Sequence, residues 1–305
     1  MMAIQLVTYA SVIIAIAAMI IKAMRYARAP EHFRWELYPV PHEKGRAEYG
    51  GSYLEELDWW SKPRHSDMIK ELKEMMSEIF FLKGVYRHNK RVWTSSFPFH
   101  FGLYLCIGWL VLLLGGAILQ KIGLEISATA NWLGMIIHYM TIISGYAGLV
   151  LAGLGAFGLF IWRATSPGQK AYNSPSEYFN LIVFDIVIAI TLIAQLSTDQ
   201  SFLVLRAYVG SLVTFTAAPA VTTLMAIEII LVSLLIMYIP LTKMSHFVAK
   251  YFLYHSVRWN DEPNAKGSAI EKRIAELLQQ KVGWQASHIS TGKSWIEVVK
   301  ETKNE

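Results

Sequence analysis

The sequence predicts an all-α integral membrane protein: a bundle of five transmembrane helices, with the N-terminus outside, the C-terminus cytoplasmic and amphipathic cytoplasmic segments. Two observations predict this fold, namely long uncharged apolar runs and an unequal distribution of lysine and arginine. The chain has 305 residues, of which 54% are hydrophobic, and an ordinary soluble domain is less apolar than that. We therefore expect a multi-pass protein of the cell (cytoplasmic) membrane, in contact with membrane lipid.

Five apolar runs have the length of a membrane span, which is roughly 20 residues. They are residues 1–21, 97–120, 126–162, 179–198 and 207–242. The first three carry no charge, the fourth carries only Asp185 and the fifth only Glu228. Because backbone groups in lipid must find their hydrogen bonds within the protein, each run is expected to be a helix.

Lysine and arginine are divided unequally between the connecting segments. Segments 22–96, 163–176 and 243–305 hold 26 of the 28, and the other two connections hold one each, Lys121 and Arg206. The positive-inside rule places the basic segments in the cytoplasm and the N-terminus outside. The first run lacks a preceding positive charge and is followed by Lys22 and Arg25, so we expect a retained helix and not a cleaved signal peptide.

The runs divide the chain into four parts. These are transmembrane helix 1 (1–24), a cytoplasmic segment (25–96), a four-helix membrane bundle (97–255) and a cytoplasmic tail that docks a partner subunit (256–305). Helical spacing of apolar residues predicts an amphipathic helix over 66–93, lying either on the membrane surface or against a partner. In the tail, Ser268 and Glu271 form a capping-box pattern, and a second short helix is expected at 294–300.

Composition also excludes several classes of function. The net charge of +5 follows from the topological bias and indicates no nucleic-acid role. Cys106 is the single cysteine, so the chain contains no internal disulfide and no cysteine-rich iron–sulfur or zinc motif. Any iron–sulfur cluster would belong to a partner.

Two histidines at the cytoplasmic ends of apolar runs form a candidate haem site. His100 lies near the start of the second run and His246 follows the fifth. If the fifth helix continues past His246, both imidazoles lie at similar depth and can ligate one haem iron axially, which makes them metal ligands. Gly102 would make room for the macrocycle. Lys243 and Arg91 would meet its propionates. The alternative is a pair of hydrogen-bonded structural histidines.

Two motifs carry a resemblance to a known family. They are Phe-His-Phe-Gly-Leu-Tyr at 99–104 and Ile-Pro-Leu-Thr-Lys-Met-Ser-His at 239–246. Both resemble motifs of the membrane cytochrome b superfamily of respiratory nitrate reductase gamma subunits. The closest resemblance is to the DsrM/HmeC branch, which belongs to heterodisulfide-reductase-like complexes. Segments 35–42, 49–53 and 292–295 are also similar to that branch.

The resemblance implies a proximal haem b on His100 and His246. It also implies a function in anaerobic sulfur respiration and sulfate reduction. The chain would oxidise menaquinol and pass electrons through haem b to a cytoplasmic iron–sulfur subunit of the heterodisulfide-reductase-like, DsrK type. Further membrane and periplasmic redox subunits are implied as partners. The enzyme role is then that of a quinol-oxidising subunit, with terminal catalysis in the partner.

The sequence departs from the family at the second, distal haem. Leu110 and Glu228 stand where the gamma subunits have histidines. We expect His138, in the outer half of the third run, to serve either a rearranged second haem or a quinol. Glu228 would accept or relay the released proton. Asp185 could line an inner proton path or form a hydrogen bond near the proximal haem, and the alternative is a structural role, capping a neighbouring helix or pairing with a tyrosine. A structural contact between His138 and Glu228 is the alternative.

Two other functions remain open. Asp185, Glu228 and His138 could line a path in a proton- or ion-translocating membrane protein without haem. The chain could also be a membrane anchor whose cytoplasmic segments hold an enzyme. A haem spectrum separates both from the cytochrome.

Overall fold

The computed structural model describes residues 2–29, 40–46, 48–63, 65–260, 264–287, 289 and 291–301. These residues are helical or irregular, and their extended pieces form only isolated bridges. The all-α prediction is therefore confirmed for the part of the chain described. Most of the segment 35–42, which carries part of the family resemblance, lies outside it.

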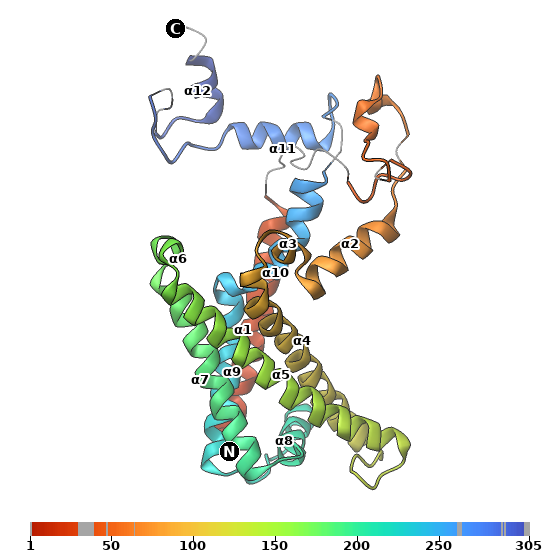
Figure 1. The fold of residues 1–305 in the computed structure, drawn as a ribbon, viewed down its shortest axis with the longest axis vertical. Coiled ribbons are helices and arrows are strands. Elements are labelled where there is room, and N and C mark those ends of the chain that lie inside the picture. Colours follow the sequence, from red (N-terminus) through yellow and green to blue (C-terminus); the bar gives the residue numbers. More distant parts are fainter. Residues whose placement is uncertain are drawn as a thin grey trace. The chain divides into compact units, whose positions relative to one another are not determined.

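Among the residues described, five helices are long and apolar enough to cross a membrane (Figure 1). They are α1 (Met2–Ala27), α4 (Lys90–Lys121), α5 (Trp132–Thr165), α7 (Pro175–Thr198) and α9 (Thr223–Leu241). This agrees with a multi-pass membrane protein. The side of the membrane on which each terminus lies stays a prediction.

The sequence marks where several of these helices begin. The side chain of Asn89 accepts a hydrogen bond from the backbone of Val92 at the start of α4, and Asn131 does the same for Gly134 in α5. Ser174 precedes α7, and the Glu177 carboxylate accepts from its backbone N–H. Each cap satisfies an N–H group that the first helical turn leaves unpaired.

The chain forms two compact units. One comprises Met1–Ile16 and Met75–Leu241, and the other Ala17–Glu74 and Thr242–Glu305. The first unit contains α4, α5, α7 and α9 with the beginning of α1. The second contains the rest of α1 and the polar segments.

Helices α4 and α5 make the most extensive contact in the first unit. Gly102 of α4 lies against α5, where an added Cβ would come within 2.3 Å of the Ala152 nitrogen and 2.7 Å of the Gly148 oxygen. Gly155 approaches the backbone of Phe99 equally closely. Small residues let two backbones touch, which is how helices associate in lipid. The expectation that Gly102 makes room for a macrocycle is wrong, because α5 fills that space.

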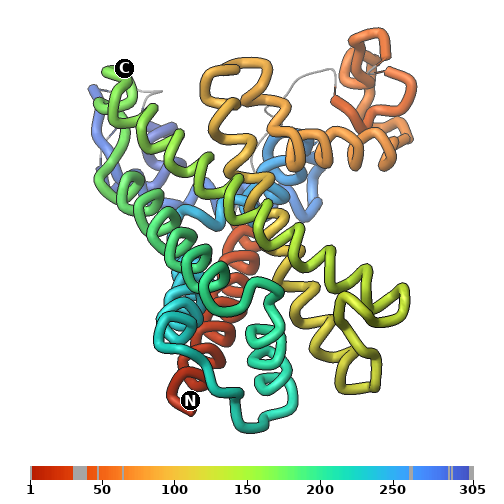
Figure 2. The backbone as a smooth tube through the Cα atoms, turned by 60° about the horizontal axis from the view of Figure 1, so that its bottom comes forward, coloured from red at the N-terminus to blue at the C-terminus, as the bar shows by residue number. Residues whose placement is uncertain are grey.

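The predicted fifth span, 207–242, is two helices. The short α8 (Leu203–Thr214) and α9 are separate helices joined by a loop (Figure 2). Helix α8 ends at Phe215, whose φ of 54° is left-handed, and α9 begins eight residues later. Pro219, which lacks a backbone N–H, lies in the connection. Helix α8 packs against α4. Arg206 consequently lies inside this helix and not in the connecting loop where its charge suggested it.

Polar side chains fasten the beginning of α1 to α8 and α9. Gln5 Nε2 donates to Ser211 Oγ of α8 at 3.1 Å. Thr8 Oγ1 lies 2.8 Å from the hydroxyl of Tyr208 in α8 and 3.0 Å from that of Ser233 in α9. Interhelical hydrogen bonds of this kind join helices that have no hydrophobic drive to associate in lipid.

The amphipathic region is broken where the periodicity predicted a single helix. It forms α2 (Met68–Phe81) and α3 (Lys83–His88), separated by Leu82 with a left-handed φ of 51°. Helix α6 (Pro167–Tyr172) follows α5. The prediction for the tail is confirmed: Ser268 caps α11 (Ala269–Leu278), and α12 spans Trp295–Glu301.

The chain does not continue as one helix from Glu228 to His246. Helix α9 ends at Leu241, Thr242 is extended, and Lys243–Ser245 forms a 3-10 turn. His246 then opens α10 (His246–Phe252), which leads into a π-helical turn at Leu253–Arg258. Two further 3-10 turns, Tyr53–Glu55 and Trp59–Ser61, lie in the polar segment.

Candidate functional site

His100 lies on α4, half-buried, with its ring fixed by its own helix. Nδ1 is 2.7 Å from the backbone oxygen of Ser96, one turn earlier. Because a carbonyl only accepts, Nδ1 carries the proton and donates, and the lone pair of the imidazole is on Nε2. Histidines that ligate metals are held in this way, by a hydrogen bond from the other ring nitrogen. The residues therefore fit an axial haem ligand at His100.

The other residues predicted for this haem are exposed and belong to other parts of the chain than His100. His246 is exposed at the start of α10, in the second unit, and Lys243 is exposed in the preceding 3-10 turn. Arg91 is exposed in the first turn of α4. The pairing of His100 with His246 on one iron stays a prediction from the sequence.

Leu110 occupies a hydrophobic environment. It packs against the core formed by Trp109, Leu113, Phe202 and their neighbours. A leucine has no lone pair to offer iron, so this position holds apolar packing where the gamma subunits hold a ligand.

Glu228 of α9 is paired with Gln195 of α7. Both side chains are buried, with exposed fractions of 1% and 0%. Gln195 Nε2 donates to the two carboxylate oxygens at 2.8 and 2.7 Å. A buried carboxylate is costly unless it accepts hydrogen bonds, and Gln195 supplies them across the helix interface. Gln195 is a partner that the sequence alone did not indicate.

His138 of α5 lies near a residue that sequence reasoning missed, Arg206 of α8. Arg206 Nη2 donates to Thr141 Oγ1 at 3.2 Å, and Thr141 is one helical turn from His138. His138 and Glu228 thus have different neighbours, Arg206 and Gln195. The available signal for Arg206 was its place among apolar residues, with no other charge from 202 to 214.

Asp185 is half-buried on α7 and has no hydrogen-bond partner among the described residues. Its placement in an apolar helix keeps it a candidate for proton transfer.

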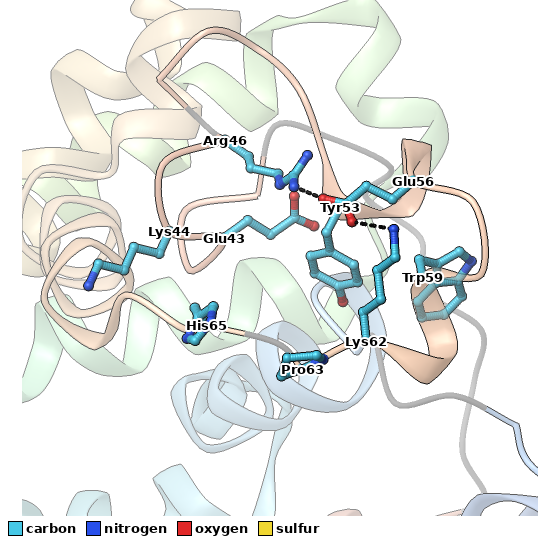
Figure 3. Close-up of a pocket in the computed structure, with 9 residues that line it drawn as sticks. All are labelled: Glu43, Lys44, Arg46, Tyr53, Glu56, Trp59, Lys62, Pro63 and His65. Atoms are coloured by element: carbon cyan, nitrogen blue, oxygen red, sulfur yellow. Dashed lines mark hydrogen bonds and ion pairs between the residues drawn. The ribbon is translucent and has the colours of Figure 1, made fainter.

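A separate polar pocket lies in the second unit, at the segment that follows residue 40 (Figure 3). Glu56 forms ion pairs there with Arg46 and with Lys62, the latter at 2.9 Å. The buried Glu43 accepts from Ser52 Oγ at 2.9 Å. These pairs stabilise the irregular segment, and none of the predicted redox residues lines the pocket.

Searches with protein-family models, among curated proteins and among solved structures found no match to this chain. The fold and the buried polar groups therefore define a class only: a helical protein with five helices of membrane-spanning length and ionisable side chains in their interior.

Proposed function

We propose that the chain is a membrane cytochrome b that oxidises menaquinol and delivers electrons to a cytoplasmic iron–sulfur subunit. That subunit would be of the heterodisulfide-reductase-like, DsrK type, and the complex would act in anaerobic sulfur respiration. The observation that carries the proposal is the 2.7 Å hydrogen bond from His100 Nδ1 to the Ser96 carbonyl. It fixes the ring with the proton on Nδ1, as in histidines that ligate metals, and His100 lies in the motif for which the resemblance implies haem b.

The residues have distinct roles in this proposal. His100 and His246 hold the iron, and Arg91 and Lys243 balance the propionates. Haem b supplies a one-electron carrier between a two-electron quinol and the partner. Glu228, buried and paired with Gln195, takes up a proton within the bundle, and Asp185 serves the inner half.

The test is a pyridine-haemochrome assay with a reduced-minus-oxidised spectrum on the purified chain, expressed with haem available. We expect a b-type spectrum in the wild type and its loss in both His100→Ala and His246→Ala. His88→Ala is the matched control, because His88 lies on α3 outside the five apolar helices. A wild-type protein without haem would overturn the proposal.

A second function is favoured by one observation, the Gln195–Glu228 pair buried between α7 and α9. Buried carboxylates in membrane helices also occur in proton- and ion-translocating proteins. That function predicts no haem and a proton or cation flux in liposomes that Glu228→Gln abolishes. A haem spectrum together with no flux would reject it.

A further inference from the structure

Arg206 is a buried cation with unused donors. Its side chain is fully buried, with an exposed fraction of 0%. Of its donor nitrogens, Nη2 bonds Thr141 Oγ1 at 3.2 Å, whereas Nε and Nη1 have no hydrogen-bond partner among the described residues. An arginine in an apolar interior is costly, and its presence by default indicates a function.

The nearby acidic residue is already engaged. Asp199 immediately precedes this region, and its carboxylate accepts from the backbone of Leu203 at 2.8 Å and of Leu205 at 3.0 Å, at the beginning of α8. Among the described residues Arg206 forms no ion pair within 4.0 Å. The guanidinium therefore has N–H donors that could bind an acceptor from outside the chain.

His138, one helical turn before Thr141 on α5, has a second unused group. The ring is 5% exposed, and Nδ1 has no hydrogen-bond partner in the described structure. His100 differs, because its Nδ1 is fixed by a carbonyl as in metal-ligating histidines. His138 lacks that support, which favours a hydrogen-bonding role over a role as ligand of a second haem.

We propose that Arg206 and His138 together bind one oxygen of a quinol headgroup, between α5 and α8. This inference rests on the proposed function, since it names the site at which the quinol of that reaction is held. Arginine only donates, so it bonds a lone pair of the quinol oxygen. His138, with its proton on Nε2, accepts the hydroxyl hydrogen at Nδ1.

The chemistry balances with this pair at one end of the substrate. Oxidation of one quinol breaks two O–H bonds and gives a quinone, two protons and two electrons. One proton passes to His138 Nδ1 and the other leaves at the opposite oxygen. The electrons go to the iron–sulfur partner, which is the oxidant. The resulting carbonyl keeps its hydrogen bond from Arg206.

Gly116 of α4 provides the space for the guanidinium. An added Cβ would lie 3.1 Å from Arg206 Nε and 3.3 Å from its Cδ, closer than ordinary contacts. At the adjacent Gly115 an added Cβ meets nothing within 4 Å. The two glycines therefore form a matched pair, in which only one substitution presses on the proposed site.

The experiment measures binding of menadione, a tail-less naphthoquinone, to the purified full chain by calorimetry, and the KM for menadiol in reduction of the bound haem. We expect Arg206→Gln to raise the Kd for menadione and the KM for menadiol by about 10- to 100-fold, which is the effect of losing a hydrogen bond from a charged donor. Arg206→Lys should raise these constants less than Arg206→Gln does, because lysine keeps the positive charge but lacks the planar set of N–H donors of the guanidinium group. Gly116→Ala should weaken binding and Gly115→Ala should not.

Two outcomes separate this inference from the proposed function. Wild-type haem content with unchanged menadione binding in Arg206→Gln and Gly116→Ala would overturn the inference and leave the cytochrome intact. A wild-type chain without haem would overturn the cytochrome, and calorimetry would still show whether menadione binding depends on Arg206. If Arg206→Gln does not fold, Arg206→Lys and Gly116→Ala decide the matter.

Discussion

The close contact of α4 and α5 predicts a large difference between two similar substitutions in α4, Gly102→Ala and Gly108→Ala. At Gly102 the new Cβ would lie 2.3 Å from the backbone nitrogen of Ala152, whereas at Gly108 it meets nothing within 4 Å. Ordinary contact begins near 3.4 Å, so 3.4 − 2.3 = 1.1 Å of separation is required. Because the obstructing atom is backbone, a whole helix must shift.

The magnitude follows from comparing the two variants. Each gains the helix propensity of alanine over glycine, about 1 kcal/mol, so this contribution cancels. Overpacking of a tight interface costs about 1–3 kcal/mol, and this cost applies to Gly102→Ala alone. With roughly 2–4 °C of Tm per kcal/mol in a large domain, we expect Gly102→Ala to melt about 2–12 °C below Gly108→Ala.

The assay is thermal unfolding of the purified chain in one detergent, followed by near-ultraviolet circular dichroism. Haem content of both variants is measured alongside, because Gly102 is two residues from His100. Equal melting temperatures for Gly102→Ala and Gly108→Ala would refute the argument, since they would mean that α4 and α5 do not touch at Gly102.

Two further predictions concern individual polar contacts. Gln195→Leu leaves the buried Glu228 carboxylate without its hydrogen-bond donor, so it should lower the free energy of unfolding by about 1–3 kcal/mol, measured by chemical unfolding. Glu228→Gln removes the charge and should destabilise the protein less. Equal effects of the two substitutions would contradict this prediction. In the tail, the backbone N–H and hydroxyl of Ser294 donate to Glu297 and lower the pKa of that carboxyl below its ordinary 4.5. The resulting stabilisation is complete above pH 4.5 and is lost as pH falls through the lowered pKa. Trp295 fluorescence should therefore report loosening of α12 in acid. If Glu297→Gln shows the same acid response as the wild type, the prediction is contradicted.

The long helices could be predicted because length and apolarity suffice for that purpose. Four of the five predicted runs correspond to one long helix each. The fifth run was predicted wrongly, because residues 207–242 carry no charge except Glu228 and apolarity alone does not reveal the break, which lies at the left-handed Phe215 and Pro219. Hydropathy does not report φ. The break at Leu82 was not predicted either, because the helical periodicity of residues 66–93 does not reveal a left-handed φ.

The candidate site was predictable only where a polar residue stands alone in an apolar run. His100, His138 and Glu228 meet that condition. Arg206 also stands alone among apolar residues, but it directly precedes the predicted fifth run and was therefore counted with the charges of the connecting loop. Gln195 was missed because an uncharged amide in a helix carries little signal. What joins these residues is proximity between helices, which a single sequence does not provide.

The short helix α8 has a consequence for how the protein is made. Its 12 residues extend about 18 Å, well short of the roughly 30 Å hydrocarbon core, and its arginine opposes insertion by about 2.5–3.5 kcal/mol. Helix α8 is therefore a poor substrate for the translocon by itself. Helices α4 and α5 are synthesised before α8, so Gly116 and Thr141, the residues that contact Arg206, are already present when α8 leaves the ribosome. We therefore expect insertion of α8 to be a late step of biogenesis that depends on α4 and α5, whose Gly116 and Thr141 precede Arg206 by 90 and 65 residues.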